Sequence, residues 1–167
     1  RRYGVPIYAT EGTIRQMKSM SSLGTIDEGL YHVVHADEDF FIGDMKVEPF
    51  AISHDAAEPV AYRFECGEKS TAVATDMGVY NDYIVEHLKG LDTVLLEANH
   101  DIQMLQVGPY PYPKKIYLGH LSKENNYAEL AYETVRLEIE LDPVDYKSGD
   151  FDIQVADREQ CSGVCNF

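Results

Sequence analysis

Four apolar segments of this 167-residue sequence each run directly into polar residues that can bind a metal or transfer a proton. Residues 47–53 lead to His54, residues 70–75 to Asp76, residues 93–96 to Glu97 and His100, and residues 114–119 to His120. Imidazole suits zinc and manganese, and a carboxylate can bridge two cations about 3.5 to 4 Å apart. Side chains that follow neighbouring strands of an α/β sheet converge at one edge of it. We therefore predict that His54, Asp76 and His120 bind metal, with Asp76 as the bridge.

Each of these residues also has a simpler interpretation when it is considered alone. A histidine after a strand is often a hydrogen-bonded structural group. Asp76 begins the sequence Asp-Met-Gly, which could form a turn in which the carboxylate caps the next helix. The metal-site interpretation depends on the combination of these residues, in one order, after successive strands.

The remaining segments predict a layered α/β protein. The residue patterns predict a strand at 5–9, a hairpin at 60–75 that turns at Gly67, a helix at 81–88 that stops at Gly90, and a strand within 150–157. A longer helix is expected after Ser122, which can cap it. The apolar stripe of that helix, which we expect to be core, consists of Tyr127, Leu130, Ala131, Thr134 and Val135.

Length and composition predict a single domain over residues 1–167, because a chain of this size with 44% hydrophobic residues can bury one substantial core. No stretch reaches the roughly 18 to 20 consecutive apolar residues that a membrane helix needs, so no membrane association is expected. Cys66, Cys161 and Cys165 are too few and too irregularly spaced for a disulfide framework, which favours a reducing, cytoplasmic location. The sequence does not set the oligomeric state.

The chain is acidic, with 29 Asp and Glu against 14 Lys and Arg and a net charge of −15. Long-range electrostatics would therefore repel a polyanion. Bound divalent cations could reverse this potential locally, because they are often the largest charges in a site. Acidic composition is also common in cytosolic proteins, so the charge by itself does not exclude a nucleic-acid substrate.

The order of several motifs resembles the YycJ/WalJ-type branch of the metallo-β-lactamase-fold hydrolases. The matching strings are SHDAAEPVAYRFE (53–65), ATDMG (74–78), LLEANHD (95–101), GPYPYP (108–113) and LGHLSKENNYAELAYETVRLEI (118–139). The resemblance covers nearly the whole chain. It implies an α/β fold, a four-layer αββα sandwich that is incomplete here, with two divalent metal ions (zinc or manganese) at one edge. It also implies that His54 and His120 are metal ligands, that Asp76 bridges the metals, and that the activity is hydrolysis of DNA from a 5′ end.

The sequence departs from this family in two places. The HxHxDH motif, which supplies most of the remaining ligands, is absent, and a helix with a GHLSN motif is missing between Pro113 and Lys114. We interpret both as segments omitted from the sequence, the first of them ahead of residue 1. The alternative is a deletion in the protein itself, which would leave an inactive scaffold.

Hydrolysis of a phosphodiester also requires a proton for the leaving oxygen. His100 is the candidate general acid, with Glu97 orienting it or a neighbouring histidine. His100 could equally be a hydrogen-bond partner of a metal ligand. Candidate substrate contacts lie on or just after the proline-rich loop: Lys114 and Lys115 for phosphates, Tyr110 and Tyr112 for stacking on bases. The alternatives are solvated lysines and tyrosines that pack the loop down.

Two other functions fit the same residues. The site could act on RNA or on a small phosphodiester or ester, which an acidic surface would tolerate better. A chain without the HxHxDH segment could instead be a metal-poor, non-catalytic binding domain. Metal content separates these functions, because a hydrolase of this kind holds about two metal equivalents per chain and a binding domain holds none.

Overall fold

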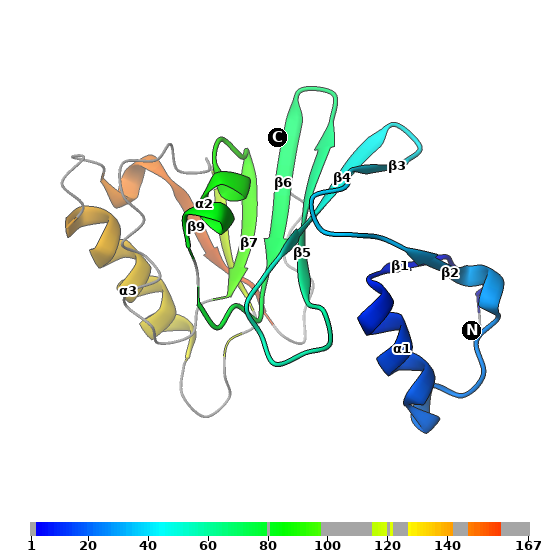
Figure 1. The fold of residues 1–167 in the computed structure, drawn as a ribbon. Helices are drawn as coiled ribbons and strands as arrows, with labels where there is room; N and C mark the ends of the chain where they lie inside the picture. Colours follow the sequence, from blue (N-terminus) through cyan, green and yellow to red (C-terminus); the bar gives the residue numbers. More distant parts are fainter. Residues whose placement is uncertain are drawn as a thin grey trace.

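The computed structural model describes residues 3–79, 81–97, 115–119, 121, 127–141 and 147–157 (Figure 1). The helices are α1 (Glu11–Ser19), α2 (Asp82–Leu88) and α3 (Ala128–Leu141), with 3-10 turns at Ser21–Leu23, Glu28–Leu30 and Ser148–Asp150. The strands are β1 (Ile7–Ala9), β2 (Tyr31–Val33), β3 (Phe40–Ile42), β4 (Met45–Ala51), β5 (Val60–Cys66), β6 (Lys69–Ala74), β7 (Thr93–Glu97), β8 (Lys115–Gly119) and β9 (Asp152–Val155). In these ranges no helix is long and apolar enough to cross a membrane.

The strands β3 to β9 form a seven-stranded sheet in chain order, while β1 and β2 form a separate parallel pair. The pairs β3–β4, β4–β5 and β5–β6 are antiparallel, and the pairs β6–β7, β7–β8 and β8–β9 are parallel. Two successive antiparallel pairings give β4 the same direction as β6. The carboxyl ends of β4, β6, β7 and β8 therefore lie at one edge of the sheet, as predicted from the residues that follow these strands.

One face of the large sheet is covered by α2 and α3 (Figure 1). The α3 side of this core joins Ala131, Val135 and Ile139 of the helix to Ala72, Val94, Ile116 and Leu118 of the strands. The α2 side joins Ile84 to Phe50, Ala61, Ala74 and Met77. The three buried α3 residues recur every fourth position, as expected for one stripe of an amphipathic helix.

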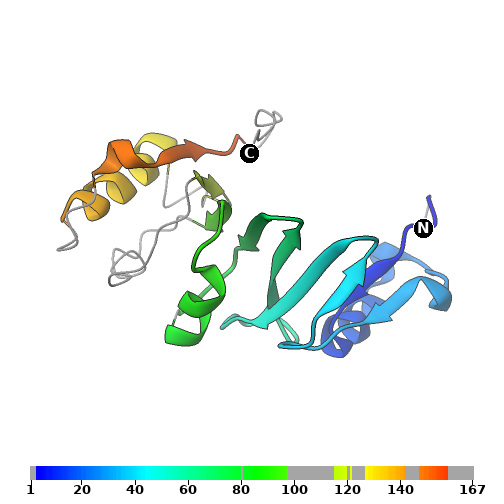
Figure 2. The same cartoon turned by 90° about the horizontal axis from the view of Figure 1, so that it is seen from above.

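The small sheet and α1 lie on the other side of the large sheet, near β4 and β5 (Figure 2). Ala61 faces the helices, so its neighbour Tyr62 points the opposite way, and the Tyr62 hydroxyl donates to the Tyr8 carbonyl of β1 at 3.4 Å. The described elements thus agree with the mixed α/β fold, with two sheets and flanking helices, that the resemblance implied.

Most predicted elements are present, with shifted ends. The hairpin turns at Gly67, α2 is capped by Asn81 and followed by Gly90, and both glycines have positive φ. The first strand begins at Ile7 and not at residue 5. The placement of Tyr127 in the core was wrong, because this residue precedes α3 and is 61% exposed. Ser122 lies outside the described residues. The helix α1 and the strands β2 and β3 were not predicted from the sequence.

The packing of α3 can be tested with two substitutions on the same helix. Ile139→Ala should lower the free energy of unfolding by about 2 to 5 kcal/mol, because Ile139 is 1% exposed and its removal leaves a cavity against the sheet. Leu137→Ala is the matched control, because Leu137 is 47% exposed, and it should change that free energy by less than about 0.5 kcal/mol. Urea unfolding followed by circular dichroism measures both. Equal losses in the two variants would contradict this packing.

Candidate metal centre

His54 and Asp76 meet at the carboxyl edge of the large sheet. The Nε2 atom of His54 lies 3.9 Å from Oδ1 of Asp76, although the two residues follow different strands, β4 and β6. The other ring nitrogen, Nδ1, lies 3.1 Å from Oδ1 of the neighbouring Asp55. The side chains of His54 and Asp76 are 35% and 42% exposed, so the pair opens to solvent. A histidine that binds metal usually has its second nitrogen beside a carboxylate or carbonyl, and Asp55 fills that position here.

Asp76 lies in a strained turn that is fixed by backbone contacts. Its φ is +59°, a left-handed conformation in which side-chain-bearing residues are uncommon and which aspartate tolerates better than most. The Gly78 amide donates to the Ser53 carbonyl at 2.6 Å, which ties this turn to the residue before His54. A Cβ on residue 78 would lie 3.1 Å from that carbonyl oxygen, so glycine lets the two backbones approach.

Glu97, the last residue of β7, is hydrogen-bonded to the same turn. Its side chain is buried, with 9% of the residue exposed, and its Oε2 accepts a hydrogen bond from the Met77 amide at 3.1 Å. Glu97 is also the register partner of Gly119 at the end of β8. The ends of β4, β6, β7 and β8 are therefore linked in one chain of contacts. From the sequence we expected Glu97 to orient a histidine; the described contact of its side chain is with the backbone beside Asp76.

The geometry of the pair fits a shared cation. A nitrogen ligand and an oxygen ligand each lie about 2.0 to 2.2 Å from a bound zinc ion, so two ligands of one ion are separated by at most roughly 4.3 Å. The separation of 3.9 Å between His54 Nε2 and Asp76 Oδ1 is within this limit. In the described part of the chain no three His, Cys, Asp or Glu side chains come together in a metal-binding group. His54 and Asp76 thus supply part of a donor set.

The other predicted site residues are not all at this edge. Lys115 is the first residue of β8, at the opposite end of the strand from Gly119, and its Nζ lies 3.0 Å from Oδ2 of Asp152. Hydrogen bonds from Gln154 and then from Lys115 lower the pKa of Asp152, as expected for a paired carboxylate. A substrate contact by Lys115 stays a prediction that this placement does not support. The predicted residues outside the described ranges are His100, Tyr110, Tyr112, Lys114 and His120.

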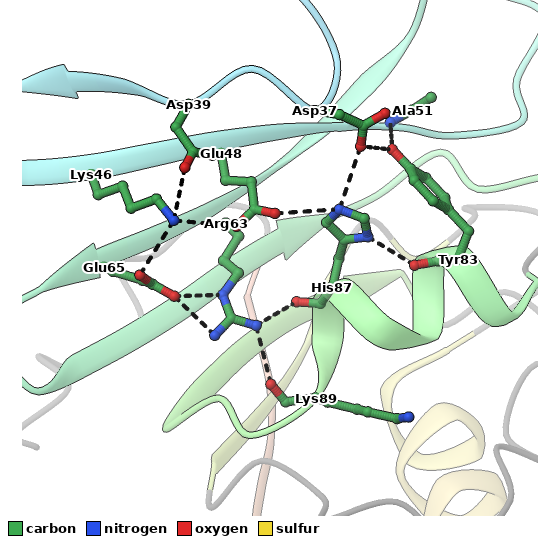
Figure 3. Close-up of polar contacts among 10 residues, drawn as sticks. All are labelled: Asp37, Asp39, Lys46, Glu48, Ala51, Arg63, Glu65, Tyr83, His87 and Lys89. Carbon is green, nitrogen blue, oxygen red and sulfur yellow. Dashed lines mark hydrogen bonds and ion pairs between the residues drawn. The ribbon is translucent and has the colours of Figure 1, made fainter.

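Helix α2 follows the Asp76 turn, and side-chain contacts attach it to the large sheet (Figure 3). These contacts were not predicted from the sequence. The Tyr83 hydroxyl accepts from the Ala51 amide at 3.1 Å and donates to Oδ1 of Asp37 at 2.6 Å. Burial, and then the bond to Asp37, raises the pKa of Tyr83. This phenol therefore attaches α2 to the end of β4, three residues before His54.

His87 and Arg63 complete this attachment (Figure 3). The His87 ring stacks on the buried Phe50 at 4.8 Å, with Nδ1 2.8 Å from the Tyr83 carbonyl and Nε2 3.4 Å from Glu48 Oε1. Arg63 Nη1 donates to the carbonyls of His87 and Lys89, which end the helix, at 3.0 and 3.1 Å. Polar residues alternating along β4 and β5 would be the only sequence signal for this network, because its members are far apart in the chain.

Comparison with known proteins adds a family match. The family described as "Beta-lactamase superfamily domain" matches residues 1–135. The "Exodeoxyribonuclease WalJ" of Streptococcus pneumoniae (strain D39) is 35% identical over 164 residues, covering 81% of this chain and 61% of that protein. The "Exodeoxyribonuclease YycJ" of Bacillus anthracis is 32% identical with the same coverage. The chain thus spans 61% of the length of these two relatives.

Solved structures show the same fold. The metallo-β-lactamase fold protein YhfI from Bacillus subtilis matches with a TM-score of 0.61 at 13% identity, covering 90% of this chain and 61% of that one. A structure described as a new diphosphatase from the PhnP family matches with a TM-score of 0.61 at 25% identity, covering 91% of this chain and 55% of that one. At 13% identity the first likeness supports the fold alone.

The role of Glu97 can be measured without any metal. Glu97→Ala should lower the free energy of unfolding by about 1 to 3 kcal/mol, because the buried Met77 amide loses its acceptor. The same substitution should speed hydrogen exchange at the Met77 amide more than at amides in β5. Glu68→Ala, in the exposed hairpin turn, is the control and should change neither quantity. Unchanged protection of Met77 in the Glu97 variant would show that this bond does not hold the turn.

Proposed function

Because this chain belongs to the β-lactamase superfamily and has the metallo-β-lactamase fold, we propose that it is part of a metal-dependent phosphodiesterase that degrades DNA from a 5′ end. The family implies divalent metal ions. We further propose that two ions, zinc or manganese, are bound by His54, Asp76 and His120, with Asp76 as the bridge. The observation that carries this proposal is the 3.9 Å approach of His54 Nε2 to Asp76 Oδ1 at the carboxyl edge of the sheet.

Bound divalent ions supply an activated water and stabilise the negative charge that develops during hydrolysis. The residues of the chain prepare the site for them. Asp55 orients the His54 ring so that Nε2 faces Asp76, and Glu97 holds the Asp76 turn through Met77. His100 gives a proton to the leaving oxygen as general acid. These roles require that the ligands stay in place before the substrate arrives, which the backbone contacts around Asp76 favour.

DNA as the substrate is supported by the names of two relatives, both exodeoxyribonucleases, at 35% and 32% identity. The net charge of −15 means that a polyanion can approach only where bound cations and a few basic or aromatic side chains reverse the local field. Lys114, Tyr110 and Tyr112 are the candidates on this chain, whereas the pairing of Lys115 with Asp152 at the start of β8 does not favour such a role for Lys115. We propose a cytoplasmic location, which agrees with the exposed free thiol of Cys66.

A second candidate function is hydrolysis of a small phosphodiester or diphosphate. It is favoured by the structural match to a diphosphatase, which at 25% identity aligns with 91% of this chain. A compact substrate would also avoid most of the repulsion from the acidic surface. A non-catalytic binding domain is the remaining alternative, and it differs from both enzymes by holding no metal.

Asp76→Asn tests the metal site directly. Asparagine tolerates the left-handed conformation of residue 76 and keeps the shape of aspartate, so the fold should be retained. Loss of the charged bridge should reduce bound metal in the full-length protein from about two equivalents to less than one, and should lower activity more than about 100-fold. Elemental analysis and a DNA digestion assay measure the two effects. Asp44→Asn, in the exposed β3–β4 turn, is the charge-matched control. Full metal and activity in the Asp76 variant would mean that the ligand assignment is wrong.

The substrate is tested with the full-length protein and Mn²⁺ or Zn²⁺. Linear DNA with a phosphorylated 5′ end should be degraded, a chelator should stop the reaction, and the rate should fall steeply as salt is added because phosphate contacts are screened. End-labelled DNA, RNA and a chromogenic phosphodiester are digested in parallel. Hydrolysis of the small ester with DNA untouched would replace the DNA proposal by the second candidate.

His100→Ala should lower the turnover number while metal content stays close to two equivalents, because a general acid acts on the leaving group and not on the ions. Single-turnover digestion of DNA and elemental analysis of the same sample measure the two quantities. A loss of metal in this variant would instead assign His100 to the ligands.

A further inference from the structure

The loop between β4 and β5 carries His54 and is closed at its base by the sheet. Ala51 pairs with Val60 at the end of the ladder, and the Ile52 amide donates to the Pro59 carbonyl at 3.3 Å. Residues 53–58 project from this base and are exposed. The first residue of this loop, Ser53, is held by the hydrogen bond that its carbonyl accepts from the Gly78 amide, close to Asp76. The last residues of the loop, 57 and 58, are held by a different set of hydrogen bonds.

These hydrogen bonds join residues 57 and 58 to the N-terminus of α1, which lies 44 to 48 residues earlier in the sequence. The Thr10 hydroxyl donates to the Glu58 carbonyl at 2.8 Å, and the Thr13 hydroxyl donates to the Ala57 carbonyl at 3.0 Å. Oε2 of Glu58 accepts from the Gly12 amide at 2.5 Å. The first amides of a helix have no partner within the helix and carry the positive end of its dipole, so a carboxylate is well matched to this position.

Two features show that this contact is closely fitted. Glu58 has a φ of +59°, which is uncommon for a residue with a side chain. Gly12 has no room for a side chain, because a Cβ there would lie 2.7 Å from the Cβ of Glu58 and 2.8 Å from its Oε2. Glycine at the start of a helix is unfavourable for the helix itself. Its presence at residue 12 is explained by the approach of Glu58.

We propose that Glu58 is a positioning residue for the metal site: by binding the N-terminus of α1, it holds the loop so that the His54 imidazole stays beside Asp76. The inference rests on the proposed role of His54 as a metal ligand. In this role Glu58 acts through His54 alone. When the carboxylate is lost, the loop occupies its metal-competent conformation for a smaller fraction of the time, and metal binds more weakly in proportion.

Two variants of the full-length protein test this by different routes. Glu58→Ala removes the carboxylate, whereas Gly12→Ala keeps it and displaces it with a methyl group. Each should weaken Mn²⁺ binding about tenfold or more, as measured by calorimetric titration. Gly12→Ala separates positioning from helix propensity, because alanine favours the helix α1 and any weakening of binding must then come from the displacement of Glu58. Glu58→Gln keeps an acceptor oxygen and should recover part of the affinity.

Glu11→Ala is the matched control, because Glu11 is also an acidic residue at the start of α1 but is paired only within the helix, with Arg15 at 3.2 Å, as far as the described contacts show. It should bind Mn²⁺ within about twofold of the wild type. The imidazole resonances of His54, followed by NMR in the metal-free protein, should broaden or shift in both test variants and not in the control. Wild-type affinity in Gly12→Ala and Glu58→Ala would overturn the inference while leaving the metal site intact. Absence of Mn²⁺ binding by the wild-type protein would overturn the proposed function, and this inference with it.

Discussion

The contact between the buried Glu97 carboxylate and the Met77 amide connects the architecture of this chain to its chemistry. It joins the end of β7 to the turn after β6, where Asp76 lies. Without this bond, the parallel strands would end near one another, but the turn that presents Asp76 would lose its described link to β7 and keep the Gly78–Ser53 contact. Glu97 is also the register partner of Gly119, so the same residue lies next to both the Asp76 turn and the end of β8.

The contact matters because the backbone that it holds is strained. Asp76 and Glu58 both have φ of +59°, and conformations of this kind cost about 1 to 3 kcal/mol each. A hydrogen bond to a charged group contributes about 1.5 to 3 kcal/mol, so one such bond per turn is of the right size to offset the strain. Each turn has one: Glu97 accepts from Met77, and Glu58 accepts from Gly12. Strain that is balanced in this way is characteristic of functional sites.

The sequence predicted elements whose signals are local. Gly67 and Gly90 adopt positive φ where the sequence placed a turn and a helix end, and Asn81 caps α2 through the Ile84 amide. The shared edge of His54 and Asp76 also followed from strand order. The contacts that the sequence could not indicate join residues that are far apart in the chain. Glu97 binds the Met77 amide 20 residues away, and Glu58 binds the Gly12 amide 46 residues away. The helix α1 was missed because it buries only Ile14, which leaves a weak periodic signal.

The proposed function requires that the carboxyl edge of this sheet binds metal through His54 and Asp76. The most direct test is anomalous diffraction from crystals of the full-length protein grown with Mn²⁺. If His54 and Asp76 are metal ligands, an anomalous peak is expected within about 2.0 to 2.3 Å of both His54 Nε2 and a carboxylate oxygen of Asp76. Manganese bound elsewhere in the crystal, with neither His54 nor Asp76 in contact with it, would show that these residues are not the metal ligands.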